Sequence, residues 1–173
     1  MKLKLLMLVL FSTLNLSAIT VGETPKNITI EGDNGGNVAD GSTWNSNTIK
    51  DKVYVMFYVD PDEKGVNEHF SAALKEKKYR EKGAFGSMAI INLAATWKPN
   101  FVIEKILQSK QEEFPDTIYV KDKSSVLVKE WNVADDASNI LVFDKTGKLL
   151  FYKSGKMEDK DMTKVFQIIE ENL

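Results

Sequence analysis

Two long apolar runs stand out from the mixed hydrophobic and polar pattern of the chain. Residues 52–59 and 85–93 are apolar at most positions, and the first run is rich in β-branched and aromatic side chains. Runs that are apolar on both faces are typical of strands buried in the centre of a sheet. After each run, apolar residues recur at helical spacing, over about residues 64–80 and again from Pro99 to Pro115. The pattern therefore predicts strand, helix, strand, helix.

The ends and packing faces of these two helices can also be predicted. Asp62 is expected to cap the first helix, because an aspartate side chain accepts hydrogen bonds from the free backbone N–H groups of a first turn. Pro99 suits the first turn of the second helix, since its missing N–H would have no partner there. An apolar stripe is expected to pack this second helix on the sheet; it comprises Val102, Ile103, Ile106 and Leu107.

The second half of the chain follows a different order. Residues 117–120 have the pattern of a short strand, and Ser124 is placed to cap a short helix. Two apolar runs, 139–143 and 148–152, flank four turn-forming residues, which is the pattern of a β-hairpin. The chain closes with a predicted amphipathic helix over residues 157–173.

The elements ahead of the first long run are short. Residues 27–31 predict a strand, and the glycine-rich residues 31–43 predict turns and loop. Along the rest of the chain, alternating strands and helices require crossovers between parallel strands, whereas the hairpin adds an antiparallel edge. The expected fold class is therefore α/β, a three-layer sandwich with a mixed central sheet, helices on both faces and a C-terminal ββα unit.

The N-terminus has the pattern of a signal peptide. Lys2 and Lys4 precede a short apolar run, residues 5–11, and small residues follow up to Ala18. The run is well short of the ~20 residues that span a bilayer, which disfavours the alternative of an uncleaved anchor. We therefore expect a signal peptide over residues 1–18, one domain over residues 19–173, and no membrane span after cleavage.

Charge and cysteine content exclude several classes of function. The net charge is −2, and removal of Lys2 and Lys4 with the signal peptide makes it −4, which argues against nucleic-acid binding. The basic residues within 75–82 alternate with glutamates, as on a solvated helix face. The chain contains no cysteine, so thiol–disulfide exchange, cysteine-dependent peroxide reduction and thiolate metal sites are excluded.

Several short segments give the chain a resemblance to a known family. Thr43-Trp44-Asn45-Ser46 lies ahead of the first long strand, and residues 139–148 with Ser154-Gly155 precede the closing helix. In this order the segments resemble the bacterial YtfJ family, and the layout is similar to thioredoxin-like proteins of the peroxiredoxin-like branch. The resemblance implies a thioredoxin-like fold and export to the periplasm, and it supplies no catalytic residues.

Two segments depart from working thioredoxins. Their redox pair follows the central strand, where this chain has residues 60–67 without sulfur, and their cis-proline precedes the hairpin, where residues 135–139 contain no proline. The resemblance therefore implies that both halves of the thiol site are absent. Thioredoxin-like folds bind peptides beside this position. The candidate binding surface consists of Asp60, Asp62, Glu63, Lys64, Gly65, Ala137 and Ser138.

The carboxylates of this region leave other interpretations open. Those within residues 60–63 suit a first helical turn, where they would cap the backbone and offset the helix dipole. A carboxylate- or metal-dependent enzyme would require at least two of them, or of Asp135 and Asp136, to converge; the loop at residues 33–40 is a second candidate for a hard cation. A small anion would instead bind at the helix N-terminus beside Lys64.

The single histidine and the three tryptophans receive structural interpretations. His69 lies at the edge of its helix's apolar stripe, and no Gly-x-Ser-x-Gly elbow supplies a serine for a triad, so His69 is expected on the surface. Trp44, Trp97 and Trp131 are expected in the core or at its edge, with each indole N–H bonded locally.

The sequence therefore predicts an exported, periplasmic domain that binds a protein or peptide partner without redox chemistry. No cofactor and no nucleic acid are expected. The alternatives are a carboxylate- or metal-dependent enzyme and a protein that binds a small anionic ligand. The binding interpretation rests on fold analogy, and it predicts a partly apolar groove near residues 60–65 and 137–138.

Overall fold

The structure is a computed structural model that describes residues 18–173. The predicted signal peptide, residues 1–18, lies outside this range except for Ala18, so it stays a prediction. Among the helices of the described range, none combines the length and apolarity that crossing a membrane requires.

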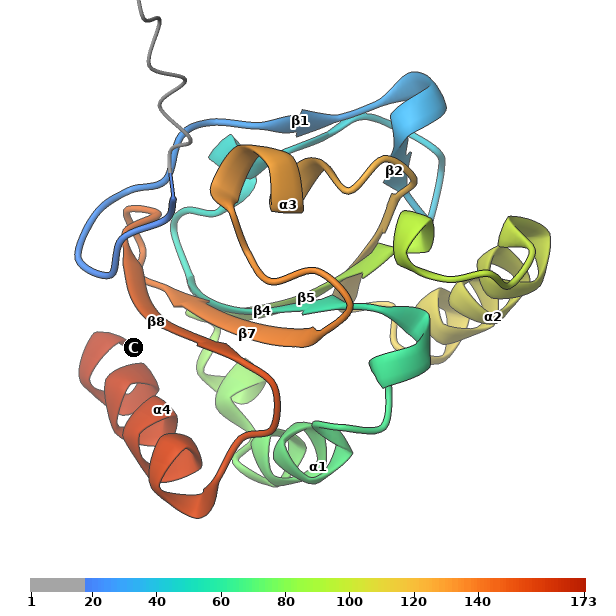
Figure 1. Cartoon of the computed structure of the whole chain (residues 1–173). Coiled ribbons are helices and arrows are strands. Elements are labelled where there is room, and N and C mark those ends of the chain that lie inside the picture. The colour runs from blue at the N-terminus through green and yellow to red at the C-terminus, as the bar shows by residue number, and fades with distance from the viewer. Residues whose placement is uncertain (1–17) are drawn as a thin grey trace, which may run out of the picture.

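A six-stranded mixed sheet forms the centre of the molecule (Figure 1). From one edge to the other, its strands are β2 (Gly35–Asn37), β6 (Thr117–Asp122), β5 (Phe85–Asn92), β4 (Val53–Val59), β7 (Ser138–Phe143) and β8 (Leu149–Ser154). Strands β4, β5 and β6 run parallel, whereas β2, β7 and β8 are antiparallel to their neighbours. The predicted mixed sheet and its β7–β8 hairpin are confirmed.

Helices cover both faces of this sheet. They are α1 (Glu68–Glu76), α2 (Asn100–Glu113), α3 (Val126–Trp131) and α4 (Asp159–Asn172). Figure 1 shows α1 and α4 on one face and α3 on the other. Helix α2 joins the α1 face, because its buried residues pack with Ile91, whereas the neighbouring Ile90 belongs to the core under α3. The steps from β4 to β5 and from β5 to β6 run in the same direction, so right-handed crossovers place α1 and α2 together.

The two faces of the sheet carry separate apolar cores. Met56 and Tyr58 of β4 point into the core under α3, and Val53 and Val55 point into the core under α1 and α4. Successive side chains of a strand alternate between faces, so burying both faces requires the near-continuous apolar run seen in the sequence. The three-layer sandwich and its closing ββα unit are confirmed.

The remaining elements are short. Strands β1 (Thr29–Ile30) and β3 (Trp44–Asn45) pair with each other outside the main sheet. The 3₁₀ turns are η1 (Gly32–Asn34), η2 (Ser46–Thr48), η3 (Pro61–Glu63), η4 (Tyr79–Lys82) and η5 (Leu93–Ala95).

The glycine-rich segment contains β2, so the prediction of loop throughout residues 31–43 is wrong. Gly35 has a φ of 123°, and a Cβ on it would lie 1.9 Å from the backbone oxygen of Lys121 on β6. Only glycine permits this approach of the two backbones. Glycine is normally a turn signal, and here it allows an edge strand to pair.

The first predicted helix, residues 64–80, is reduced to α1 over Glu68–Glu76, with a 3₁₀ turn before it and another after it, so this prediction is wrong at both ends. The 3₁₀ turn η3 comes first, and Asp60 caps it by accepting a 2.8 Å hydrogen bond from the backbone N–H of Asp62. Asp62 is therefore not the cap. Helix α1 begins only at Glu68, and the left-handed Lys78, with a φ of 50°, separates it from η4.

The cap of α3 also differs from the prediction, because Asp122 takes the role expected of Ser124. The buried carboxylate of Asp122 accepts hydrogen bonds from the backbone N–H groups of Ser124, Val126 and Leu127, at 3.1, 2.9 and 3.3 Å. It also accepts one from the hydroxyl of Tyr58, at 3.1 Å. A strand residue thus fixes the following helix.

Helix α2 lies between Pro99 and Pro115 as predicted, but only half of its expected apolar stripe is buried. Ile103 and Leu107 pack against the sheet. Val102 and Ile106 instead remain exposed, so the prediction is wrong for these two residues.

Candidate functional site

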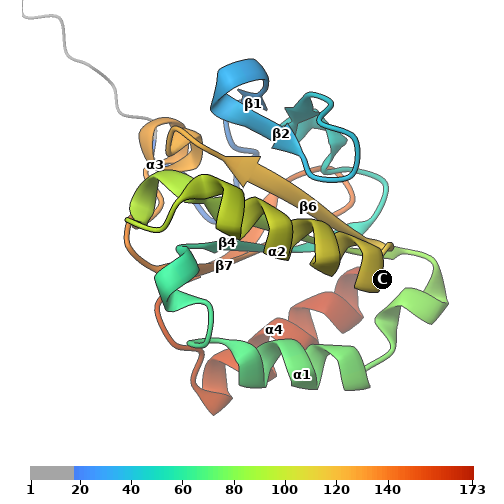
Figure 2. The same cartoon turned by 90° about the vertical axis from the view of Figure 1, so that its right-hand side faces the viewer.

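Three chain segments meet at the carboxyl ends of the parallel strands, where thioredoxins carry their thiol pair. They are residues 60–65 after β4, residues 93–99 after β5, and residues 132–137 before β7. The backbone N–H of Asp60 donates to the carbonyl oxygen of Ala137 at 3.0 Å. Figure 2 shows η3 beside the start of α2 at this end of the sheet. The sequence-predicted surface is thus brought together as one edge of the molecule.

Asp62 holds the second of these segments against the first. Its carboxylate accepts a 2.7 Å hydrogen bond from the Thr96 hydroxyl and forms an ion pair with Lys98. The two side chains on either side of Trp97 are therefore tied to η3. This contact positions Trp97 beside the predicted surface.

Asp60 is buried at this edge, with only 4% of its surface exposed. Burial is the main cause that raises the pKa of its carboxyl above the ordinary range of aspartate. Nearby carboxylates raise this pKa further, from Asp136, Glu63 and Asp135, whereas Lys98 lowers it. The edge is therefore an environment of excess negative charge.

Replacing Asp60 with asparagine is expected to stabilise the protein at pH 7. The raised pKa means that ionised Asp60 disfavours the folded state, so the wild-type chain loses stability as pH rises through that pKa. Asparagine keeps an oxygen that can accept from the N–H of Asp62 and carries no charge. Urea unfolding at several pH values checks this: the gain should disappear below about pH 4. A variant less stable than wild type at pH 7 would contradict it.

The segment before β7 is held by buried amides. The side chain of Asn92 donates to Asp135 at 2.9 Å and accepts from the Ser125 hydroxyl at 3.0 Å. Asn67 donates to the Ser138 hydroxyl at 2.9 Å. Ser138 is buried and already bonded, so of the predicted pair only the half-buried Ala137 remains partly accessible to a partner.

Four exposed apolar side chains form a patch beside this edge. The apolar patch consists of Trp97, Phe101, Val102 and Ile106, with exposures of 85%, 73%, 40% and 49%. In the described range, the only other exposed large apolar side chain is Val21. The core prediction is confirmed for Trp44 and Trp131 and wrong for Trp97. The indole N–H of Trp131 donates to the carbonyl oxygen of Lys26, whereas the buried indole N–H of Trp44 lacks the hydrogen bond expected of it. Phe101, Val102 and Ile106 lie in the first two turns of α2 and Trp97 lies just before it, so exposed apolar groups cluster at one end of this helix, as they do at interaction surfaces.

The two best-formed hollows of the described surface do not coincide with the groove that the binding interpretation predicted. Two surface hollows, of about 330 and 400 Å³, are present, and both lie away from this edge. The first is lined by Trp131, Phe143 and the 46–50 segment, and the second lies beside α3. The apolar character expected near residues 60–65 is present in the exposed side chains of the apolar patch.

The geometry gives no support to the metal and anion alternatives. Within residues 18–173, no group of three or more histidine, cysteine, aspartate or glutamate side chains is arranged to hold a metal ion. In the 33–40 loop, Asp40 instead accepts from the backbone N–H of Ser42. Because α1 begins at Glu68, the exposed Lys64 does not stand at an α-helix N-terminus.

The histidine is exposed as predicted. His69 lies on α1, and its Nε2 is 2.8 Å from the carbonyl oxygen of Met157. This contact joins α1 to the segment before α4, and it gives His69 a structural partner.

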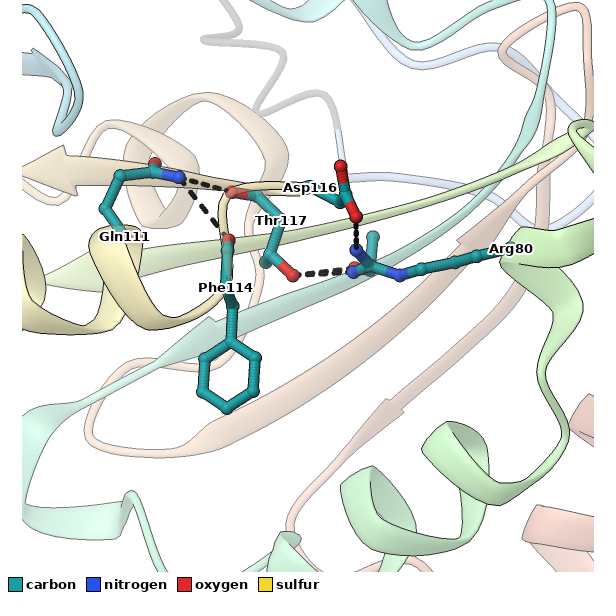
Figure 3. Close-up of polar contacts among 6 residues, drawn as sticks. Arg80, Gln111, Phe114, Asp116 and Thr117 are labelled. Carbon is teal, nitrogen blue, oxygen red and sulfur yellow. Dashed lines mark hydrogen bonds and ion pairs between the residues drawn. The ribbon is translucent and has the colours of Figure 1, made fainter.

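The basic residues within 75–82 lie toward the opposite end of the sheet, where Arg80 makes structural contacts. Figure 3 shows its guanidinium group bonded to the Thr117 hydroxyl at 2.6 Å and 3.8 Å from the carboxylate of Asp116. Gln111 of α2 reaches the same turn, donating to the carbonyl oxygens of Phe114 and Thr117. These contacts tie η4 and α2 to the start of β6.

Fold and site together define a thioredoxin-like protein whose thiol position is occupied by carboxylates. Solved structures support the fold. A peroxiredoxin-like protein from Aquifex aeolicus has a TM-score of 0.61 at 13% identity, covering 90% of this chain and 89% of that one. The thioredoxin domain of a thiol-disulfide oxidoreductase from Bacteroides vulgatus has a TM-score of 0.58 at 14% identity, covering 88% and 99%.

The chain belongs to the family described as bacterial protein of unknown function (YtfJ_HI0045), whose model matches residues 21–172. The uncharacterized protein YtfJ of Escherichia coli is 22% identical over 134 residues, 76% of this chain and 72% of that protein. An uncharacterized protein of Haemophilus influenzae is 36% identical over 69 residues, 40% of this chain and 37% of that protein's length. The resemblance given by the sequence motifs is confirmed.

Proposed function

We propose that this chain is an exported binding module that holds a protein or peptide partner, without redox chemistry, at the edge where thioredoxins carry their thiol pair. Export rests on the signal-peptide pattern of residues 1–18, and the periplasm is the compartment that the resemblance to the YtfJ family implies. The non-redox role rests on the absence of cysteine from the whole sequence.

The observation that carries the proposal is the apolar patch. An exposed tryptophan and phenylalanine four residues apart are unfavourable in water, and burying them against a partner removes that cost. Aromatic side chains are also the residues that contribute most to binding energy in protein interfaces.

The surroundings of the patch favour binding because they are already ordered. Asp62 bonds to both neighbours of Trp97, and α2 is anchored on the sheet by Ile103 and Leu107. A surface that is fixed before association loses little conformational entropy when a partner arrives. No comparable observation favours the enzyme or the anion-binding alternative.

Site-specific photocrosslinking in bacterial cells tests the proposal. The photoreactive residue would replace Phe101 in the full-length chain, and a matched control would replace the exposed Lys160 on α4. We expect a discrete crosslinked product from position 101 and none from position 160. Crosslinking of equal yield at both positions, or none at position 101, would rule out this edge as the binding surface.

A further inference from the structure

The charge beside the apolar patch is strongly unbalanced. Five carboxylates gather at this edge against two lysines, Lys64 and Lys98. The carboxylates belong to Asp60, Asp62, Glu63, Asp135 and Asp136. Asp62 alone pairs with one of the lysines, Lys98. The edge therefore keeps a local excess of negative charge next to its exposed aromatic side chains.

Three of these carboxylates remain accessible and without a cationic partner. Glu63 is half-buried, and Asp135 and Asp136 are exposed. Over residues 18–173, none of the three forms an ion pair with a lysine or arginine. Asp135 accepts one hydrogen bond from Asn92 through a single oxygen. These groups can therefore meet a cation supplied from outside.

Hydrogen bonds and an ion pair place the acidic residues beside Trp97 of the apolar patch. The contacts of Asp62 with Thr96 and Lys98 place η3 against Trp97. The hydrogen bond from Asp60 to Ala137 places the Asp135–Asp136 loop against the start of η3. A single bound segment can therefore reach both the aromatic rings and the carboxylates.

Building on the proposed function, we propose that the partner segment recognised here is cationic and apolar, with lysine or arginine side chains beside large apolar ones. Its apolar side chains cover Trp97 and Phe101, and its cations meet Asp135 and Asp136. Charge complementarity at an interface selects partners and disfavours those of the same sign, so an acidic segment would be rejected.

Fluorescence anisotropy with labelled synthetic peptides tests this inference on the full-length chain. The probes are three peptides of equal length in which leucine alternates with lysine, serine or glutamate. We expect the lysine peptide to bind about tenfold more tightly than the serine peptide at low salt, and the glutamate peptide to bind most weakly. The advantage of lysine should shrink as salt screens the charges.

A pair of charge variants locates the effect. The double variant Asp135→Asn, Asp136→Asn should reduce the ratio of the affinity for the lysine peptide to the affinity for the serine peptide. Its affinity for the serine peptide should stay unchanged. Asparagine keeps the oxygen that accepts from Asn92 and tolerates the left-handed backbone of Asp136, whose φ is 46°. The matched control, Glu23→Gln with Glu76→Gln, removes two exposed carboxylates elsewhere and should leave the advantage intact.

Each alternative result overturns the inference in a different way. Equal binding of the lysine and serine peptides would show an uncharged apolar preference and leave the proposed function standing. An equal loss of lysine preference in both double variants would assign it to the overall charge of the protein. Binding of none of the three peptides would reject this partner class, and crosslinking at position 101 would still decide the proposed function independently.

Discussion

Replacing Asp122 with alanine is expected to lower the free energy of unfolding by about 3 kcal/mol, a larger loss than at any surface position. The substitution removes the shared acceptor of three backbone N–H groups at the start of α3 and of the Tyr58 hydroxyl. Asp122 is fully buried, so water does not replace these hydrogen bonds. Thermal unfolding should show a decrease in Tm of about 10 °C.

Tyr58→Phe is the matched control for this variant. It removes one hydrogen bond to the same carboxylate, so we expect a loss of about 1 kcal/mol. If both variants lost the same stability, the backbone hydrogen bonds of Asp122 would contribute nothing, and its role in fixing α3 would be wrong.

The double variant Trp97→Ser, Phe101→Ser is expected to bind the partner identified by crosslinking at least ~30-fold more weakly than the wild-type chain. Truncating aromatic interface residues costs about 2 kcal/mol of binding free energy or more. Both side chains are mostly exposed, so the stability of the free protein should change by less than about 0.5 kcal/mol. Isothermal titration with the purified partner measures the first effect, and urea unfolding measures the second.

Val21→Ser is the control for this double variant, because it removes an exposed apolar side chain that lies outside the patch. It should leave the affinity unchanged. An affinity that survives the double substitution at Trp97 and Phe101 would show that the partner binds elsewhere on the chain.

The fold was predictable because its signals are local. The apolar run over residues 52–59 predicts a strand buried on both faces. In β4, alternate side chains point into the two cores on opposite faces of the sheet, as predicted. The hairpin follows from turn-forming residues between two apolar runs. Pro99 and Pro115 lie at the two ends of α2, because proline fixes its own φ and has no backbone N–H to continue a helix.

The candidate site was only partly predictable because its decisive features depend on tertiary contacts. The resemblance to thioredoxin-like proteins located residues 60–65 and 137–138, and the structure brings them together. Periodicity gave Val102 and Ile103 equal weight as core residues. The rotation of α2 on the sheet buries one and exposes the other, and adjacent sequence positions do not encode that rotation.

The buried polar contacts also could not be predicted from the sequence. Asn67 bonds to Ser138 and to the backbone N–H of Met157, which lie 71 and 90 residues away along the chain. Its side chain therefore turns inward and does not cap α1. A pattern of residues gives no sign of such partners, because they become neighbours only when the sheet has formed.

Iodide quenching of tryptophan fluorescence, in the free protein and in the complex with its crosslinked partner, tests the central claim most directly. Trp97 is exposed, whereas Trp44 and Trp131 are buried, so the quenchable signal of the free protein belongs to Trp97. If the apolar patch is the binding surface, this quenchable fraction disappears when the complex forms. If Trp97 stays fully quenchable in a saturated complex, the partner does not cover the patch and the proposed binding surface is wrong.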